Sequence, residues 1–552
     1  MMKTKLLSAG LAAALLVFCA PGANAQSRII LNNLDAAGVG LNDTTPATPS
    51  AGNPGATLGE QRRIAFQYAA DIWGALLDSP TPIRVNASFA PLQCDDDKII
   101  LGQAGPTSHQ RNFPNAPLAG TDYTVAQASA LAGEDLARGG AHLQAWFSSA
   151  IDSPTCQEEQ GARGWYYGLL GNDDNAENRS NFLNVIMHEM GHGLGMIGRL
   201  SQSVYDNIAW SNQSGQSIRD LAATDSLGLF EAITTPGDVV WTAGLANATG
   251  ALLADNRQVL AVSDPNPAGY ALTQASFGNQ DLSSFPAGNV VLMRDVPATQ
   301  GGAGTSLGCE GASGQQPLAN PEALAGNIAL VDRGECEFGI KALNAQNSGA
   351  VAVIIANSDD DTSLTPGPGE RGDEVTIPVI LVARSSGQAL RGDAPVIVAG
   401  IRPDPDRFYG LDDNGRLRLY TPSEFSSGST YSHVDTDMQP NALMEPAETS
   451  TLQAHVFIDV ALDMFEDMGW PTNRDGTARI GQCDTGVPMV RDGSFIPGAN
   501  LVAQQGLCST AANGNRSKYM ACMNDHAMQL RDLGILTNPE VVQVRSCVAK
   551  LR

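Results

Sequence analysis

The chain has 552 residues, of which 43% are hydrophobic and 16% are charged, and its formal net charge at pH 7 is −25. A chain of this length is expected to form several domains rather than one core. A surface this acidic repels nucleic acid and anionic membranes, so neither is expected as a partner.

The N-terminus has the composition of an export signal. Lys3 and Lys5 precede an apolar run from Leu6 to Phe18, and Ala23–Ala25 offers a small-x-small cleavage site. Residues 1–25 are therefore expected to be a signal peptide and the mature protein to be secreted, with transit through or residence in a periplasm also compatible. No later stretch approaches the roughly 20 apolar residues of a membrane-spanning helix, so stable membrane insertion is not expected.

Eight cysteines follow the signal peptide, and an even number in an exported chain is typical of disulfides. None has CxxC spacing, so a zinc site made of cysteines is not expected. Pairing of nearest neighbours predicts Cys94–Cys156, Cys309–Cys336, Cys483–Cys508 and Cys522–Cys547.

The first two hundred residues alternate between helical and extended patterns. Gln61–Leu77 repeats apolar residues at helical spacing, and Ile83–Phe89 alternates as a strand does. Asn181–Met196 is the next strong helix, with Ser180 as its expected N-cap and with glycines that loosen its end.

From residue 252 to residue 402 the pattern changes to short β-branched runs between Gly, Pro and Asp turns, which is typical of a β or α/β unit with its own core. The strands expected there are Asn327–Val331, Ala350–Ala356 and Val379–Val382. Phe457–Met468 is a further amphipathic helix, and residues 476–552 hold four cysteines and two expected short helices.

The most informative stretch is His188-Glu189-Met190-Gly191-His192, at the end of an apolar helix. A helix places residues four apart on one face, so both imidazoles can bind one Zn²⁺ ion. Glu189 lies beside them and can take a proton from zinc-bound water, whose pKa the metal lowers. A chance match on an ordinary helix is the alternative, and a pattern this specific rarely arises by chance.

A catalytic zinc usually has three protein ligands, and the extended motif HExxHxxGxxH would place the third at Gly198. His433 is the first candidate instead, because Asn441–Pro446 (NALMEP) follows it and has the form of a turn that places a methionine beneath a metal site. His109 and His142 lack such a setting and are expected to be surface or packing residues. The alternatives left open for the third ligand are His455, Asp435, Glu445 and Glu448.

These segments resemble the leishmanolysin branch of the metzincin zinc peptidases, in which HExxHxxG is followed at a distance by SHxx and NxLM. The matching residues are His188, Glu189, His192, Gly195, Ser432, His433, Asn441, Leu443 and Met444. The resemblance implies that His188, His192 and His433 bind zinc, that Glu189 is the general base and that Met444 is the methionine of the Met-turn. The chain departs from the family in the connection from His192 to His433, which at 241 residues is far longer than usual.

A second resemblance explains this long connection. Gly326–Phe338 (GNIALVDRGECEF), Lys341–Asn357 and Ile377–Val379 resemble the protease-associated (PA) domain, which is found inserted in or attached to peptidases and sorting receptors. A self-contained insert whose ends lie close together can interrupt a catalytic domain without separating its halves.

Two further features are open. Tyr420 and Tyr431 are the possible donors to a reaction oxyanion. Asp412–Gly415 (DDNG) is expected to be a turn rather than a calcium loop, because the other acidic positions of an EF-hand are missing.

The expected fold is therefore α+β, a metzincin-like two-part catalytic domain interrupted by an inserted α/β PA domain. The expected parts are the signal peptide 1–25, the peptidase segments 26–251 and 403–475, the PA insert 252–402 and a disulfide-linked helical segment 476–552. The predicted function is a secreted zinc-dependent endopeptidase that acts on proteins or peptides, and its oligomeric state is not predicted. The alternatives are a catalytically inactive PA-domain binding protein on a metalloprotease scaffold and a zinc hydrolase of non-peptide amides.

Overall fold

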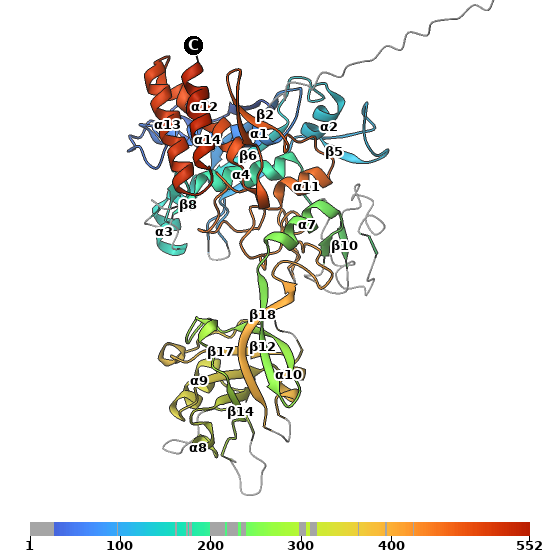
Figure 1. Cartoon of the computed structure of the whole chain (residues 1–552), viewed down its shortest axis with the longest axis vertical. Coiled ribbons are helices and arrows are strands. Elements are labelled where there is room, and N and C mark those ends of the chain that lie inside the picture. The colour runs from blue at the N-terminus through green and yellow to red at the C-terminus, as the bar shows by residue number, and fades with distance from the viewer. Residues whose placement is uncertain are drawn as a thin grey trace, which may run out of the picture. The chain divides into compact units, whose positions relative to one another are not determined.

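The chain folds into two compact units, one formed by residues up to Ala254 together with Gly410–Arg552, and the other by Asp255–Tyr409 (Figure 1). The expected signal peptide, residues 1–25, lies outside the described residues. The computed structural model describes residues 27–95, 98–160, 163–172, 175, 179–198, 216–217, 230–232, 239–296, 305–309, 317–360, 362, 364–391, 395–422 and 424–551.

The first unit contains a four-stranded sheet in the order β1-β2-β6-β3. Strands β1 (Ile29–Asn33), β2 (Ile83–Ala90) and β6 (Leu143–Ser148) are parallel, and β3 (Gly102–Pro106) pairs antiparallel with β6. Alternate residues at the start of β2 are buried, as the period of a half-buried strand requires. The prediction of a strand here is confirmed, and β3 is left as an edge of the sheet.

Helix α1 (Leu58–Leu76) packs against helix α4 (Phe182–Leu194). The indole N–H of Trp73 in α1 donates to the carbonyl of Met187 in α4 at 3.1 Å. Both helices were predicted, and their starts differ from the predicted ones because of capping. Helix α1 starts three residues early because Thr57 accepts a hydrogen bond from the Glu60 N–H.

The predicted N-cap of α4, Ser180, is wrong by one residue. The side chain of Asn181 accepts hydrogen bonds from the N–H groups of Leu183 and Asn184 at 3.0 and 3.3 Å, which is the contact of an N-cap. Ser180 instead belongs to the short strand β8 (Ser180–Asn181). Ser180 and Asn181 are both residue types that favour an N-cap. The sequence alone does not show which of the two has the backbone geometry of the cap.

The predicted helix Phe457–Met468 is shorter in the structure, where α11 spans Ala461–Asp467. Asp459 has a φ of 43°, in the left-handed region, and its carboxylate accepts hydrogen bonds from the N–H groups of Leu443 and Ala461. A residue in this conformation interrupts a helix, so α11 begins only after it.

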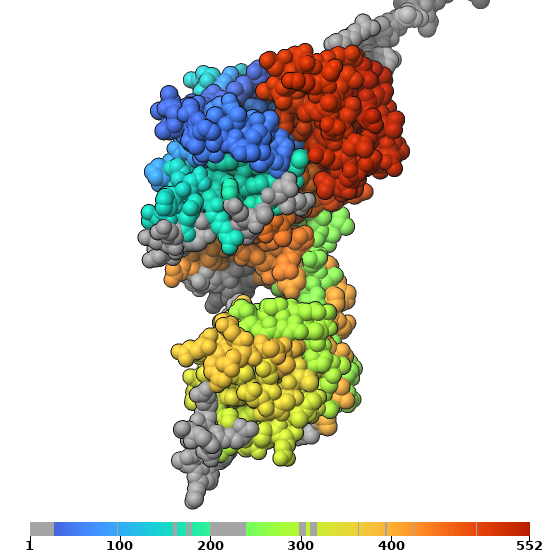
Figure 2. Space-filling model, turned by 90° about the vertical axis from the view of Figure 1, so that its left-hand side faces the viewer, coloured from blue at the N-terminus to red at the C-terminus, as the bar shows by residue number. Residues whose placement is uncertain are grey.

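The C-terminal segment is a hairpin of β19 (Thr477–Ile480) and β20 (Cys483–Pro488) followed by three helices rather than the two expected. Their bounds are α12 Pro497–Ala512, α13 Arg516–Asp532 and α14 Asn538–Lys550. Helix α12 packs on α1, so the segment coloured red lies directly against the N-terminal part coloured blue (Figure 2). The hydrophobic cluster of this segment includes Val456, so it is continuous with the rest of the unit.

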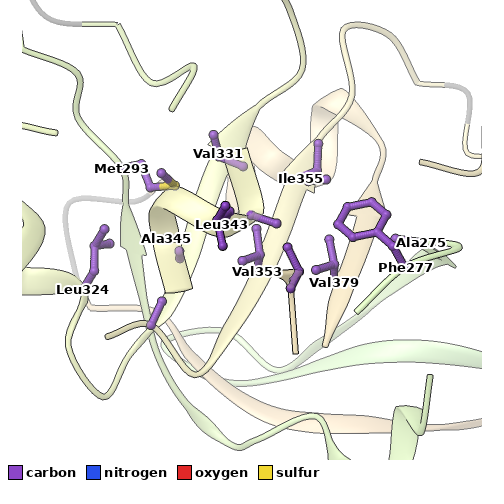
Figure 3. Close-up of a cluster of buried hydrophobic side chains, with 14 of the residues drawn as sticks. Ala275, Phe277, Met293, Leu324, Val331, Leu343, Ala345, Val353, Ile355 and Val379 are labelled. Atoms are coloured by element: carbon purple, nitrogen blue, oxygen red, sulfur yellow. The ribbon is translucent and has the colours of Figure 1, made fainter. Parts of the chain in front are cut away.

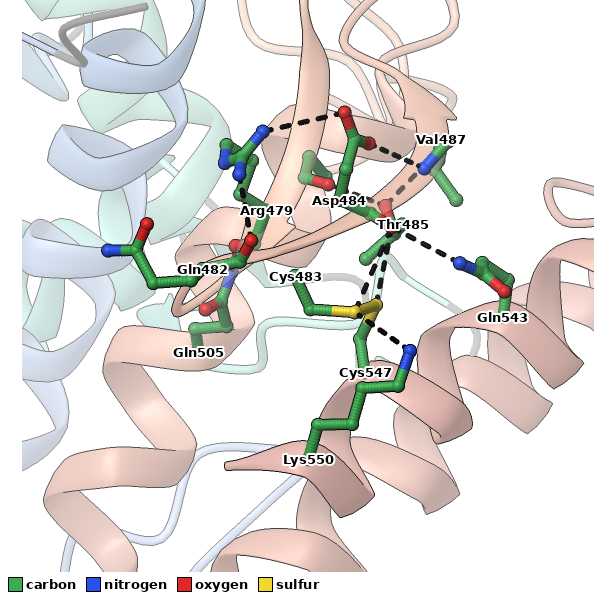
Figure 4. The surroundings of a disulfide bond; sticks show 12 residues. Arg479, Gln482, Cys483, Asp484, Thr485, Val487, Gln505, Gln543, Cys547 and Lys550 are labelled. Atoms are coloured by element: carbon green, nitrogen blue, oxygen red, sulfur yellow. Dashed lines mark hydrogen bonds and ion pairs between the residues drawn. A yellow bond between two sulfur atoms is a disulfide. The ribbon is translucent and has the colours of Figure 1, made fainter. Parts of the chain in front are cut away.

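Four disulfides are present, and two of the predicted pairings, Cys94–Cys156 and Cys309–Cys336, are confirmed. The other two are wrong, because the actual pairs are Cys483–Cys547 and Cys508–Cys522. The turn between α12 and α13 brings Cys508 opposite Cys522, and α14 returns Cys547 to the start of β20. Around the Cys483–Cys547 bridge, Gln543 on α14 donates to the carbonyl of Asp484 on β20, so helix and hairpin are held by more than the disulfide (Figure 4).

The second unit is a closed barrel of strands in the order β12-β13-β17-β16-β15-β14-β18. The pairs β14–β15, β15–β16 and β16–β17 are parallel, and the remaining pairs are antiparallel. The three predicted strands correspond to β15 (Ile328–Asp332), β16 (Ala352–Ala356) and β17 (Val379–Val382). The other strands are β12 Asn256–Asp264, β13 Ala268–Gln274, β14 Gly288–Leu292 and β18 Ile397–Phe408.

Helix α9 (Phe338–Asn347) covers one side of the parallel strands in this unit. Leu343 and Ala345 from the helix meet Val353, Ile355 and Val379 from the strands in a buried cluster (Figure 3). A second cluster with Leu260, Ile328, Ile354 and Ile380 lies on the opposite side of these strands. The unit therefore has a hydrophobic core of its own.

The remaining elements are short. In the first unit they are the strands β4 His109–Arg111, β5 Asp122–Thr124, β7 Trp165–Tyr166, β9 Gln216–Ser217, β10 Phe230–Ala232 and β11 Val239–Trp241, and the helices α2 Val125–Ala132, α3 Pro154–Gln160 and α7 Gly244–Leu253. In the second unit they are the helices α8 Pro321–Leu324 and α10 Arg384–Ala389. Among the described helices, none has both the length and the apolar character needed to cross a membrane.

The two C-terminal disulfides should contribute unequally to stability. Replacing both cysteines by alanine should lower the free energy of unfolding by about 4 kcal/mol for Cys483–Cys547, separated by 64 residues, and by about 3 kcal/mol for Cys508–Cys522, separated by 14. The longer loop restricts the unfolded chain more, and urea unfolding of the full mature protein measures the difference. Mass spectrometry of an unreduced digest checks the pairing itself, and a peptide linking Cys483 to Cys508 would contradict it.

Candidate metal centre

The structure brings three imidazoles together. His188 and His192 project from α4, and His433 comes from the segment that follows the second unit. Their Nε2 atoms are 2.9 Å (His188–His192), 3.1 Å (His192–His433) and 3.2 Å (His188–His433) apart. Tetrahedral zinc–nitrogen bonds place neighbouring ligand nitrogens about 3.3 Å apart, so the spacing fits one Zn²⁺ ion.

Backbone carbonyls determine which ring nitrogen of each histidine carries the proton. The Nδ1 atoms of His188, His192 and His433 lie 2.7, 2.6 and 2.8 Å from carbonyl oxygens, those of Leu443, Met196 and Ser429 respectively. A carbonyl oxygen can only accept, so each Nδ1 must be the donor. Each Nε2 then directs a lone pair toward the other two, an arrangement that is repulsive unless a cation lies between them.

Burial keeps these imidazoles neutral. It lowers the pKa of His188 to about 4 and that of His433 to about 3, and it lowers the pKa of His192 well below its ordinary value. Neutral imidazole is the form that binds metals, so the three side chains could bind a metal ion at neutral pH without loss of a proton.

Glu189 lies next to these histidines on α4 and is only 5% exposed. Its Oε2 atom has no hydrogen-bond donor among the described residues, and burial raises the pKa of this carboxyl to about 8. A cation held by the histidines would favour the ionised form of the carboxyl.

Gly102 on the edge strand β3 makes room for this carboxylate, and sequence reasoning missed it. A Cβ atom at this position would lie 2.6 Å from Glu189 Oε1 and 2.8 Å from its carboxyl carbon. A glycine within a strand often marks such a close approach, but only the fold says what approaches.

Met444 lies directly beneath α4. It is 1% exposed, and a Cβ atom on Gly191 would be 2.6 Å from its sulfur. The N–H of Val434 donates to the carbonyl of Met444 at 2.8 Å, which joins the turn to the residue after His433. The methionine thus supports the segment between His188 and His192 and also holds the third histidine in place.

The position that the extended motif would use for a ligand cannot hold a side chain. A Cβ atom on Gly198 would lie 2.7 Å from the Cβ atom of Tyr431 and 2.9 Å from the carbonyl oxygen of Thr430. The N–H of Gly198 donates instead to the hydroxyl of Ser432 at 2.9 Å. This contact ties the end of the α4 segment to the residue that precedes His433.

The alternative ligands lie outside this cluster, which is the one group of three or more potential ligands found within the described ranges. His455 is buried beside Gly171, and the Asp435 carboxylate accepts a hydrogen bond from the N–H of Asp437. Glu445 and Glu448 line the cavity above the histidines but are not part of the group.

The remaining residues raised by the sequence have ordinary settings. His142 is fully buried and faces Asp135 at 3.3 Å, as expected of a packing residue, whereas His109 lies on the short strand β4. Asp412 accepts hydrogen bonds from the N–H groups of Asn414 and Arg416, which confirms a turn at this position. Of the two tyrosines, Tyr420 lines the cavity and Tyr431 is fully buried.

A cavity of about 620 Å³ opens over the histidines. Its lining includes the stretch from Ile100 to Ala104, which leads into β3, a strand with one sheet partner among the described strands, and residues of α4. Ser426–Ser429 and Glu445–Glu448, the latter after the Met444 turn, also line the cavity.

Comparison with known proteins identifies one domain. Residues 286–390 match the PA domain family, so a PA domain is present within the second unit. Human ER degradation-enhancing alpha-mannosidase-like protein 3 is 31% identical over 121 residues, which are 21% of this chain and 13% of that protein. A probable lipoprotein aminopeptidase of Mycobacterium tuberculosis, LpqL, is 42% identical over 71 residues, which are 13% of this chain and 14% of that protein.

These matches are local. The chain spans less than a fifth of the length of either relative, at 13% and 14%. Among solved structures, a zinc aminopeptidase from Bacillus subtilis aligns with 37% of this chain and 44% of its own, at 19% identity and a TM-score of 0.19. Only the PA domain is therefore identified by similarity.

Removing the third imidazole should weaken metal binding. We expect His433→Ala to lower the affinity for Zn²⁺ by about a hundredfold or more, because even indirect contacts of a metal site contribute 10–100-fold. Competition with a chromophoric chelator measures the affinity, and His109→Ala is the control because it removes an imidazole outside the cluster. Equal affinity in the wild type and His433→Ala would contradict the three-histidine site.

Proposed function

We propose that this protein is a zinc-dependent endopeptidase of the metzincin type, similar to leishmanolysin, with its catalytic domain interrupted by a PA-containing unit. The observation that supports this most is the convergence of three neutral imidazoles beside an unpartnered buried carboxylate. Residues 26–251 and 403–475 would form the two parts of the catalytic domain, with Met444 as the Met-turn residue.

His188, His192 and His433 would hold the ion, and Zn²⁺ there would polarise the scissile carbonyl and make a water molecule more acidic. Glu189 accepts the proton of the attacking water on its free Oε2 atom and returns it to the leaving nitrogen. The absence of a side chain at Gly102 leaves the space that this carboxylate occupies.

The edge strand β3 in the lining of the cavity favours an extended peptide as substrate. No described strand pairs with the outer edge of β3, so its backbone N–H and C=O groups there can pair with an added strand. Binding along an edge strand needs no chain terminus, which supports cleavage within a chain rather than at its end. The four disulfides support a site of action outside the reducing cytoplasm.

The competing function is a binding protein in which the PA domain binds the ligand and the histidine cluster has no catalytic role. Such a protein has no need for the spacing of the three Nε2 atoms or for the room left at Gly102. Activity measurements on two variants separate the two functions.

Glu189→Gln should abolish hydrolysis while zinc remains bound. Loss of a general base costs roughly 10²–10⁴ in rate, and the amide keeps the shape of the carboxyl group. The measurement is kcat on an unfolded protein substrate together with the zinc content of both forms. Chelated wild-type protein should regain activity when zinc is restored, and wild-type protein that binds zinc but cleaves nothing would favour the binding protein.

Gly102→Ala should lower kcat by about a hundredfold through the position of Glu189, because a displacement of about 1 Å at a reacting group can cost this much. Gly105→Ala on the same strand is the matched control, since its nearest neighbour, Ile197 Cδ1, lies at an ordinary 3.8 Å. Both variants should retain zinc. Equal activity of the two variants would show that the close contact at Gly102 is unimportant.

A further inference from the structure

We propose that Asp459 is a positioning residue of the metal centre, which holds the residue whose carbonyl orients the His188 imidazole. The inference rests on the three-histidine site of the proposed function and does not depend on which substrate is cleaved. Asp459 lies between the Met444 turn and α11, and it is not among the residues that line the cavity.

The carboxylate of Asp459 reaches this histidine through one residue. His188 donates from Nδ1 to the carbonyl of Leu443 at 2.7 Å, and the N–H of Leu443 donates to Asp459 Oδ2. An ionised acceptor makes a stronger hydrogen bond than a neutral one, so it restrains this residue of the turn firmly. With the backbone of Leu443 held, its carbonyl oxygen stays opposite the Nδ1–H of His188, and Nε2 stays directed at the other two histidines.

Two carboxylates share the support of the Met444 turn. Glu445 accepts a hydrogen bond from the N–H of Ala442 at 2.8 Å, so it closes the turn on itself. Asp459 comes from outside the turn, 16 residues after Leu443, and therefore ties the turn to another part of the unit. Loss of the Asp459 carboxylate should leave the turn closed but free to shift relative to α4.

The backbone of Asp459 is strained, and the start of a helix alone does not require this. Its φ of 43° lies in the left-handed region, which costs free energy for a residue other than glycine, and its side chain is buried. If Asp459 only began α11, the contact of Oδ1 with the N–H of Ala461 at 3.0 Å would be sufficient. The second oxygen, Oδ2, binds the turn instead. Strain of this kind clusters at functional sites, where the surrounding structure maintains it.

The C-terminal segment holds the chain just before Asp459. The N–H of Ile458 donates to the carbonyl of Ser494 at 3.0 Å. Asn500 on α12 donates from Nδ2 to the carbonyl of His455 at 2.7 Å. The C-terminal segment is therefore the far end of a series of contacts that leads through Asp459 to the metal centre.

The test replaces the carboxylate without changing its shape. Asparagine tolerates the left-handed conformation, but in Asp459→Asn one of the two N–H groups faces an NH₂ group instead of an oxygen. We expect the affinity for Zn²⁺ at about pH 8 to fall by about tenfold, the lower end of the 10–100-fold typical of groups that orient a metal ligand. Burial raises the pKa of Asp459 to about 7, so the wild-type carboxyl is ionised at the pH of the measurement.

Two measurements separate positioning from stability. Competition with a chromophoric chelator gives the affinity. The visible spectrum of Co²⁺ bound in place of Zn²⁺ reports the ligand geometry, and we expect it to change in Asp459→Asn. Asp463→Asn is the matched control, because it removes a buried carboxylate on α11 whose partner is Arg474 at 2.6 Å, and it should leave both affinity and spectrum unchanged. If Asp459→Asn does not fold, Asp459→Gly takes its place, since glycine adopts a positive φ without strain.

Wild-type affinity together with a wild-type Co²⁺ spectrum in Asp459→Asn would overturn the inference, and so would an equal loss of affinity in Asp463→Asn. Neither measurement involves cleavage, so the inference can fail while the proposed peptidase function stands. Weaker binding and an altered spectrum in Asp459→Asn, in a protein whose wild type cleaves no peptide, would retain the positioning role and reject the peptidase.

Discussion

The mutual repulsion of three imidazole lone pairs is the constraint on which the first unit depends. Three neutral rings whose Nε2 atoms lie about 3 Å apart repel one another when no cation lies between them, so each ring must then be held in place by its surroundings. Carbonyls of Leu443, Met196 and Ser429 supply that restraint from three separate segments. The surrounding structure must in turn hold each of those three segments in position.

Glycines allow the segments to approach closely enough. Gly191 admits the sulfur of Met444 against the helix between the two histidines, and Gly198 admits the backbone at Tyr431. Gly102 does the same for the Glu189 carboxylate from the side of the sheet. Helix α4, the Met444 turn and strand β3 can therefore approach the three histidines closely, because glycines stand where these elements meet.

The sequence predicted the part of this site that lies on α4, and it predicted less of the part that comes from distant segments of the chain. Helical periodicity placed His188 and His192 on one face with Glu189 beside them, and the strands of the second unit followed from their β-branched runs. His433 and Met444 were proposed from the turn-like Asn441–Pro446 segment and from a family resemblance, because nothing in their distance along the chain from α4 indicates contact. Gly102 and Asp459 were missed because their importance lies only in what they touch. The pairs Cys483–Cys547 and Cys508–Cys522 were missed for a similar reason, since helix packing rather than sequence distance brings those sulfurs together.

The separation of His192 from His433 in the sequence costs little in folding because the second unit closes on itself. Asn256 pairs with Phe408 between β12 and β18, and the N–H of Tyr409 donates to the carbonyl of Asp255 at 2.9 Å. The ends of the unit are thus joined by its own hydrogen bonds, and its core is complete without other parts of the chain. Once folded, it acts as a short connection between Ala254 and Gly410, so the loop-closure entropy of bringing His433 to α4 is that of a much shorter chain. A metal site assembled from both sides of a large insert is therefore compatible with a single cooperative unit.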